Sequence, residues 1–200
     1  MFRGPVYRVL YCLVRFVLFF WHPVMRVVGR ENIPKDSRLI ICSNHFSMSD
    51  PVWIVLAMRC GYVPRIMAKK EAKSYPVLGS IIEKLGVIFI DRGAADVHAI
   101  KEGFRCLRNE QQLLIFPEGT RVRDLKDSAP KRGAIMLAAR TQTPVLPVYV
   151  SRKRFWLSPM TIIFGEPYEL TFEGRKASDE DLERESVALM KKIYEMGENR

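Results

Sequence analysis

The most informative stretch of the chain is Ser43-Asn44-His45-Phe46-Ser47-Met48-Ser49-Asp50-Pro51, which joins two apolar segments. The segment before it, 39–42, is short and apolar and predicts a buried strand. The segment after it, 52–58, predicts a helix, and Asp50 followed by Pro51 is typical of a helix start. The stretch is therefore a strand-to-helix junction, a place where rigid elements present side chains to a cleft.

Two side chains of this junction, His45 and Asp50, could form a catalytic pair. On an ideal helix, residues five apart point about 140° away from each other, so His45 must lie in an irregular turn if the two meet. A carboxylate on one imidazole nitrogen would fix the tautomer and leave the other nitrogen as a general base. The alternative is that Asp50 only caps the helix and His45 is a polar turn residue.

The composition is typical of one globular domain, and the net charge indicates an anionic partner. Two hundred residues with 48% hydrophobic and 27% charged side chains are enough for a real core. The net charge of +10 favours nucleic acid, an acidic lipid surface or phosphorylated substrates. The four cysteines form no C-x-x-C pair, which indicates reduced thiols and a cytosolic-facing location.

The N-terminal segment, which we take as residues 1–30, is the most unusual by composition. Residues 6–21 are almost wholly apolar and aromatic, yet Arg8 and Arg15 interrupt them on one helical face. The run is too short and too charged to span easily, since a spanning helix needs about 20 mainly apolar residues. It predicts an amphipathic helix lying in the surface of an anionic membrane. The alternative is a helix that packs on the domain itself.

Strands and helices alternate along the rest of the chain. Short apolar runs predict strands at 39–42, 65–68, 87–90, 113–116, 145–150 and 161–164. Helical patterns occupy 77–85, 94–109 and 133–140, and Ser178 with Asp181 opens a C-terminal helix. This order predicts an α/β fold: a single domain, 38–200, with a largely parallel central sheet flanked by helices.

Polar clusters follow three of the predicted strands, at 45–50, 91–92 and 118–121. If the strands are parallel, the three clusters converge at one edge of the sheet, where such sheets bind ligands. Gly119 lets the backbone approach a ligand closely, and Thr120 offers a hydroxyl donor. Each cluster taken singly could be a structural salt bridge or turn.

Several catalytic motifs are missing from the sequence. It contains no G-x-S-x-G elbow, no P-loop and no G-x-G-x-x-G. With three histidines and no H-E-x-x-H, the sequence predicts neither a metal site nor a bound cofactor. A base without a protein nucleophile suggests that a substrate hydroxyl or a water is activated.

Four blocks of sequence, in order between residues 39 and 150, resemble the lysophosphatidic acid acyltransferase family. The blocks are Asn44-His45 with Asp50, the segment 86–92, the segment 116–121, and Val145-Leu146-Pro147-Val148. A K-x-G element of the family also appears, as Lys131-Arg132-Gly133. The chain departs from the family pattern at Val122, where serine is usual, and this could alter contacts with the acceptor headgroup.

The resemblance implies acyl transfer from acyl-CoA or acyl-carrier protein to the sn-2 hydroxyl of lysophosphatidic acid, which gives phosphatidic acid. His45 would be the general base, and Asp50 would orient it. The acceptor oxygen would attack the thioester directly, without a covalent enzyme intermediate. The acyl donor is then a substrate, and no cofactor is implied.

The resemblance also implies a phosphate site for the acceptor. Its members would be Arg92, Glu118, Gly119 and Arg121, with the hydroxyl of Thr120 nearby and with Lys69 and Lys131 as weaker candidates. Because a carboxylate repels a phosphate, we expect Glu118 to hold an arginine or lysine in place.

The implied partners are lysophosphatidic acid, an acyl donor and an anionic membrane surface, at the cytoplasmic face of the inner cell membrane. Nucleic acid is disfavoured, because the basic residues are spread along the chain rather than gathered with aromatics in one stripe. Three alternatives stay open: a relative acting on another lysolipid or aminolipid, a thioesterase, and a basic membrane-binding module without catalysis.

Overall fold

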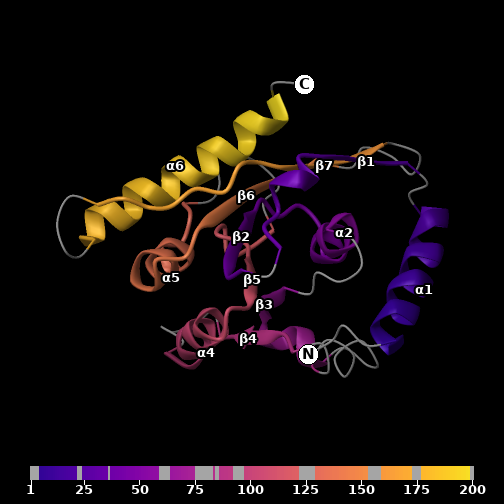
Figure 1. Cartoon of the computed structure of the whole chain (residues 1–200), viewed down its shortest axis with the longest axis horizontal. Coiled ribbons are helices and arrows are strands. Elements are labelled where there is room, and N and C mark those ends of the chain that lie inside the picture. Colours follow the sequence, from indigo (N-terminus) through magenta and orange to yellow (C-terminus); the bar gives the residue numbers. More distant parts are fainter. Residues whose placement is uncertain are drawn as a thin grey trace.

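The computed structural model describes residues 5–21, 24–35, 37–58, 64–74, 83, 86–91, 97–121, 129–152, 159–172 and 177–198. Within these ranges, seven strands form one sheet in the order β1-β7-β6-β2-β5-β3-β4 (Figure 1). The strands are β1 (Met25–Val28), β2 (Leu39–Ser43), β3 (Arg65–Lys69), β4 (Ile88–Ile90), β5 (Gln112–Ile115), β6 (Val145–Val150) and β7 (Met160–Phe164). The helices are α1 (Pro5–Trp21), α2 (Asp50–Ala57), α4 (Val97–Arg108), α5 (Gly133–Thr141) and α6 (Asp179–Glu198), with 3-10 turns η1 (Arg30–Asn32) and η2 (Lys70–Ser74).

The sheet is mainly parallel, as the alternation of strands and helices predicts. β2 pairs in parallel with β5 and with β6, and β3 pairs in parallel with β5 and with β4. The exception is the antiparallel pair of β6 and β7. The carboxyl ends of β2 to β6 therefore meet at one edge, and the loops that follow them can build a common site.

Helices cover both faces of this sheet. Along β2, Ile40 and Cys42 pack into the core beneath α4, α5 and α6, while Leu39 and Ile41 pack into the core with α2. Alternate residues of a strand point to opposite faces, so a strand buried on both sides must be apolar throughout, as β2 is. Figure 1 shows the sheet between the α4, α5 and α6 layer and the α2 side.

One strand was not expected. Residues 25–28, which the sequence pattern places in the N-terminal segment 1–30, form β1 and pair in parallel with β7. The sheet therefore begins within that segment. The four residues of β1 lie at a sheet edge, begin four positions after the aromatic run ends at Trp21, and include an arginine. So short a segment carries too little periodicity to predict a strand. The predicted helix at 77–85 lies mostly outside the described residues.

Among the described side chains of helix α1, Tyr11 and Val14 contact the rest of the domain. The Tyr11 hydroxyl donates to the Leu56 carbonyl at the end of α2 over 2.8 Å, and Val14 packs on the same core. Val9, Leu13, Phe16 and Phe20 are 57–68% exposed. At about 100° per residue these four share the face opposite Tyr11 and Val14. Among the helices of the described residues, none combines the length and apolar character needed to cross a membrane.

Candidate active site

The junction between β2 and α2 is an irregular turn, and within it the His45 and Asp50 side chains meet. His45 Nδ1 lies 3.0 Å from Asp50 Oδ2. The same carboxylate oxygen accepts the backbone N–H groups of Phe46 at 2.7 Å and Ser47 at 2.6 Å. Asp50 is the first residue of α2, and the helix takes no side-chain cap from Ser49. The carboxylate of Asp50 thus points back into the turn rather than capping the helix.

The pair is sheltered but reachable. The His45 side chain is 12% exposed and that of Asp50 is 2% exposed. The imidazole stacks on the Phe116 ring, with 4.3 Å between centroids and 30° between planes. Because Asp50 engages Nδ1, proton exchange with a substrate falls to Nε2.

Asn44 ties the start of the turn to the neighbouring strand. Its amide donates to the Val150 carbonyl at 2.9 Å and accepts the Val150 N–H at 2.8 Å. The side chain is fully buried. The asparagine of the first motif block is therefore a structural member of the site, which fixes where β2 ends and the turn begins.

Glu118 is the main departure from expectation. One oxygen of its buried carboxylate accepts the His45 backbone N–H at 2.8 Å, and the other accepts the Tyr194 hydroxyl. Burial raises the pKa of Glu118, while the hydrogen bonds from Tyr194 and His45 act in the opposite direction. The expectation that Glu118 holds an arginine or lysine is wrong, because the side chain turns inward under the catalytic turn instead of outward to the basic residues.

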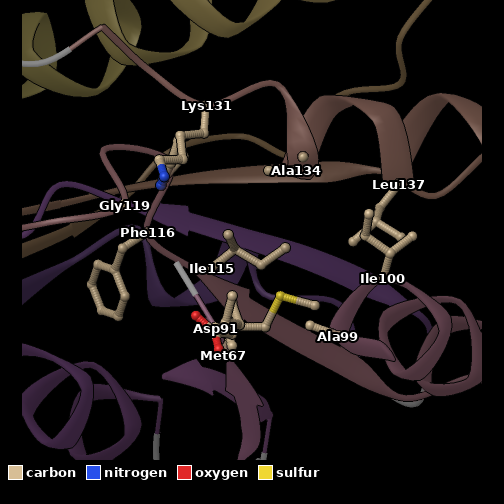
Figure 2. A pocket seen from close by; sticks show the side chains of 13 residues that line it. Met67, Asp91, Ala99, Ile100, Ile115, Phe116, Gly119, Lys131, Ala134 and Leu137 are labelled. Atoms are coloured by element: carbon tan, nitrogen blue, oxygen red, sulfur yellow. The ribbon is translucent and has the colours of Figure 1, made fainter. Parts of the chain in front are cut away.

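Gly119 and Lys131 lie against each other beside the turn. Gly119 has φ +66°, a conformation that favours glycine, and a Cβ at this position would lie 2.7 Å from Lys131 Cε, so the lysine side chain would have to move. The Lys131 backbone N–H donates to the Pro117 carbonyl at 2.7 Å. Figure 2 shows Lys131 reaching toward Gly119 on one side of a cavity, with Asp91 and Met67 on the other.

This cavity has a volume of about 240 Å³ and a mainly apolar lining. It lies between the ends of β3, β4 and β5 and the helices α4 and α5. The apolar side chains in its wall include Met67, Ile90, Ile100, Ile115, Phe116 and Leu137. Phe116 connects the cavity to the catalytic turn, because its ring also stacks on His45. An apolar chain in the cavity would have its polar end beside Lys131 and His45.

The remaining predicted site residues differ in their distance along the chain from the turn and in their partners. Thr120 and Arg121 are exposed and follow Gly119 directly. Lys69 is exposed at the end of β3 and forms an ion pair with Glu71 at 2.8 Å. Arg92 lies outside the described residues. No group of three or more metal-ligating side chains occurs in the described part of the chain, and the absence of a metal from the reaction stays a prediction.

Tyr194 was missed as a member of the site. In the sequence it follows Leu182, Leu189 and Ile193 in the apolar pattern of the C-terminal helix, which gives no sign of a role in the site. Its partner Glu118 is 76 residues away, so no spacing rule connects the two.

The family model described as Acyltransferase matches residues 24–151. The chain belongs to the acyltransferase family. The resemblance drawn from the four motif blocks is thereby confirmed at the level of the family. The matched range begins one residue before β1 and includes His45, Asp50, Glu118 and Lys131.

Two relatives of this acyltransferase carry the same name. The 1-acyl-sn-glycerol-3-phosphate acyltransferase of Borreliella burgdorferi is 38% identical over 61% of this chain and 49% of that protein. The enzyme of the same name from Bacillus subtilis is 29% identical over 86% of this chain and 87% of that protein. The chain thus spans about half of the first relative and most of the second.

A solved structure shares the fold. The crystal structure of the 1-acyl-sn-glycerophosphate (LPA) acyltransferase PlsC from Thermotoga maritima matches with a TM-score of 0.74 and 28% identity. The match covers 99% of this chain and 82% of the other. It supports the single α/β domain described above, with a mostly parallel sheet flanked by helices.

Proposed function

We propose that this acyltransferase moves an acyl chain from the thioester of acyl-CoA or acyl-carrier protein to the sn-2 hydroxyl of lysophosphatidic acid. The observation that carries the proposal is the His45–Asp50 pair, held at 3.0 Å beside an apolar cavity with Lys131 in its wall. This arrangement combines a base, space for an acyl chain and a cation for a phosphate. The names of the relatives support the same substrates.

The reaction needs one proton acceptor and no protein nucleophile. His45 Nε2 takes the proton of the acceptor hydroxyl as its oxygen bonds to the thioester carbonyl carbon. The tetrahedral intermediate collapses when the C–S bond breaks, and the imidazolium returns the proton to the leaving thiolate. The products are phosphatidic acid and the free thiol, so the acyl donor is a substrate and no cofactor takes part.

Asp50 would make His45 an effective base in two ways. Its Oδ2 atom at Nδ1 fixes the tautomer that leaves a lone pair on Nε2, and its negative charge stabilises the imidazolium formed during the reaction. Because Asp50 also holds two backbone N–H groups of the turn, it positions the ring as well.

The acceptor phosphate is assigned to the basic side of the cavity. Lys131 lines the cavity and packs on Gly119, and Arg121 follows Gly119 by two residues. Arg92, Thr120 and Lys69 remain candidates for further contacts. Glu118 is kept from the phosphate by its inward hydrogen bonds, which remove the charge conflict noted in the sequence.

We further propose that α1 seats the enzyme on the cytoplasmic face of an anionic membrane. The four exposed apolar side chains opposite its docked side support this placement, together with Arg8 and Arg15 and the net charge of +10. The acceptor and the product are both lipids, so a surface-bound enzyme would meet them where they are concentrated.

The test is acyl transfer by purified protein in mixed micelles, with labelled acyl-CoA and acyl-carrier protein as alternative donors. Lysophosphatidic acid, lysophosphatidylcholine and monoacylglycerol compete as acceptors in one assay. The proposal predicts phosphatidic acid as the main product with at least one donor. Preferred acylation of another lysolipid would move the proposal to that acceptor, and excess release of free fatty acid would indicate a thioesterase.

A matched variant tests the phosphate assignment. Lys131→Met keeps the aliphatic stem beside Gly119 but removes the charge. We expect the KM for lysophosphatidic acid to rise about tenfold, as for one lost charged contact, with little change for monoacylglycerol. Equal effects on both acceptors would remove Lys131 from the phosphate site.

A further inference from the structure

The C-terminal helix contributes a side chain to the catalytic turn. Tyr194 lies on α6, which packs along β6 on the sheet face that also carries α4 and α5. Its hydroxyl donates to one oxygen of Glu118, and the other oxygen of Glu118 accepts the His45 N–H at 2.8 Å. The Tyr194 ring also approaches the Phe46 ring, with 6.4 Å between centroids. Tyr194 therefore approaches the turn directly through its ring and indirectly, by way of Glu118, through its hydroxyl.

Glu118 depends on both hydrogen bonds to stay where it is. The residue is 4% exposed, and a buried carboxylate oxygen without a donor is unfavourable. If the Tyr194 hydroxyl is removed, rotation or protonation of the Glu118 carboxylate lowers the free energy of the site. Either change weakens its hold on the His45 N–H.

The His45 ring is positioned by three groups on two segments, Asp50 at the start of α2 and Phe116 with Glu118 after β5. Asp50 holds Nδ1, Phe116 stacks on the ring face, and Glu118 holds the backbone N–H. The Glu118 contact sets the backbone from which the imidazole projects, so a small shift there moves Nε2 relative to the substrate hydroxyl. Misplacement of a reacting group by about 1 Å can cost roughly 100-fold in rate.

We propose that Tyr194 is a positioning residue for acyl transfer, which acts on His45 through Glu118. The kinetic part of this inference rests on the proposed function, whereas its structural part concerns the geometry of His45 alone. The opposing view is that Tyr194 only packs α6 against the sheet, in which case its hydroxyl has no effect on His45.

The first experiment compares Tyr194→Phe with Tyr168→Phe in steady-state acyl transfer. Tyr194 on α6 and Tyr168 pack against the same core, and the Lys192 ammonium of α6 lies 4.3 Å from the Tyr168 ring centroid, a contact that phenylalanine retains. We expect Tyr194→Phe to lower kcat roughly 10- to 100-fold with KM within about twofold. Tyr168→Phe should change neither constant by more than about twofold. Equal kinetics for the two variants would overturn the proposal.

A double-mutant cycle then tests the route through Glu118. Glu118→Gln retains an acceptor of similar size but removes the charge. If Tyr194 acts through Glu118, Tyr194→Phe lowers kcat much less in the Glu118→Gln background than in the wild type. Additive losses would show that Tyr194 acts by another route and would contradict the inference.

A readout independent of activity separates this inference from the proposed function. Imidazole nitrogen chemical shifts from ¹⁵N-histidine-labelled protein report the tautomer and hydrogen bonding of His45. The signal is assigned by its loss in His45→Gln. Tyr194→Phe should move the His45 signals, and Tyr168→Phe should not. If the wild type transfers no acyl chain, the proposed function fails, yet these spectra still decide whether Tyr194 positions His45. Unchanged spectra would refute it.

Discussion

The turn at 43–50 and the helix α1 depart from the usual burial pattern in opposite ways. The turn buries polar groups: Asn44, Asp50 and the partner carboxylate of Glu118 are each at most 4% exposed, and each is hydrogen-bonded. Helix α1 instead exposes apolar groups, with Phe16 63% and Phe20 61% exposed.

Each exception to ordinary burial has a different physical meaning. Burying a polar group is unfavourable unless partners compensate, so the network around His45 indicates a geometry that the fold itself maintains. A contiguous exposed apolar face is unfavourable in water, so α1 indicates a partner outside the chain. The first region satisfies its polar groups within the fold, and the second is the basis for the proposed membrane contact.

Replacing His45 tests the turn most directly. We expect His45→Ala to lower kcat by roughly 10²–10⁴-fold, the range for loss of a general base, with little change in folding. The control is His98→Ala, which removes an exposed histidine from α4. Acyl transfer is measured with a labelled donor, and stability by urea unfolding. Equal turnover in the two variants would exclude His45 as the base.

Asp50→Asn should have the next largest effect. The amide still accepts a hydrogen bond from the turn but loses the charge and can present N–H to His45 Nδ1, which favours the wrong tautomer. We expect a loss in kcat of about 10²-fold, within the range for general-base catalysis. A loss of about 1.5–3 kcal/mol in unfolding free energy should accompany it, as for buried bonds to a charge.

The control for Asp50 is Asp181→Asn, which removes an exposed carboxylate that bonds Ser178 at the start of α6. Its turnover should match that of the wild type. An Asp50→Asn enzyme with full activity would break the comparison, because the buried network would then have no catalytic consequence.

Helix α1 is tested by making its exposed face polar. We expect the double variant Phe16→Ser and Phe20→Ser to bind anionic vesicles about 10- to 100-fold more weakly, since each inserted phenylalanine contributes on the order of 1 kcal/mol. The control pair is Val97→Ser and Val187→Ser, two residues that are 58% and 52% exposed on other helices. Sedimentation with phosphatidylglycerol vesicles measures the difference. Equal weakening by both pairs would remove α1 as the membrane contact.

The smallest expected effect is on the pH dependence of stability. Burial raises the pKa of Glu118 above that of the unfolded chain, so the folded state binds the proton more tightly. Wild-type stability should therefore fall, relative to Glu118→Gln, as the pH rises from the ordinary glutamate range through the raised pKa. Urea unfolding at several pH values measures this difference. Parallel stability curves for the two proteins would show that Glu118 is not perturbed.

Local patterns predicted the elements whose signals lie within a few residues. The strand at 145–150 matches β6, and the Ser178–Asp181 pair forms the reciprocal hydrogen bonds that open α6. The helix predicted at 94–109 is α4 (Val97–Arg108), and residues 94–96 lie outside the described part of the chain. Such signals survive because turns, caps and apolar periods depend on neighbouring residues.

Contacts between distant segments were not predictable in the same way. The partner of β1 is β7, more than 130 residues away, and Tyr194 meets Glu118 across 76 residues. The sequence predicts that Glu118 holds an arginine or lysine, because a carboxylate repels a phosphate. Its inward orientation depends on α6, which no pattern near Glu118 describes.

The Asn44 side chain acts as a surrogate peptide unit. Its amide carries the same donor and acceptor as a backbone group, and it satisfies both the N–H and the carbonyl of Val150. Strand β2 can therefore end at Ser43 without leaving the backbone N–H and carbonyl of Val150 on β6 unpaired. The backbone of His45, released from sheet pairing, is free to serve as the donor to Glu118. The side-chain amide of Asn44 thus replaces backbone pairing on β6 and allows the chain to depart from regular structure at His45, the proposed base.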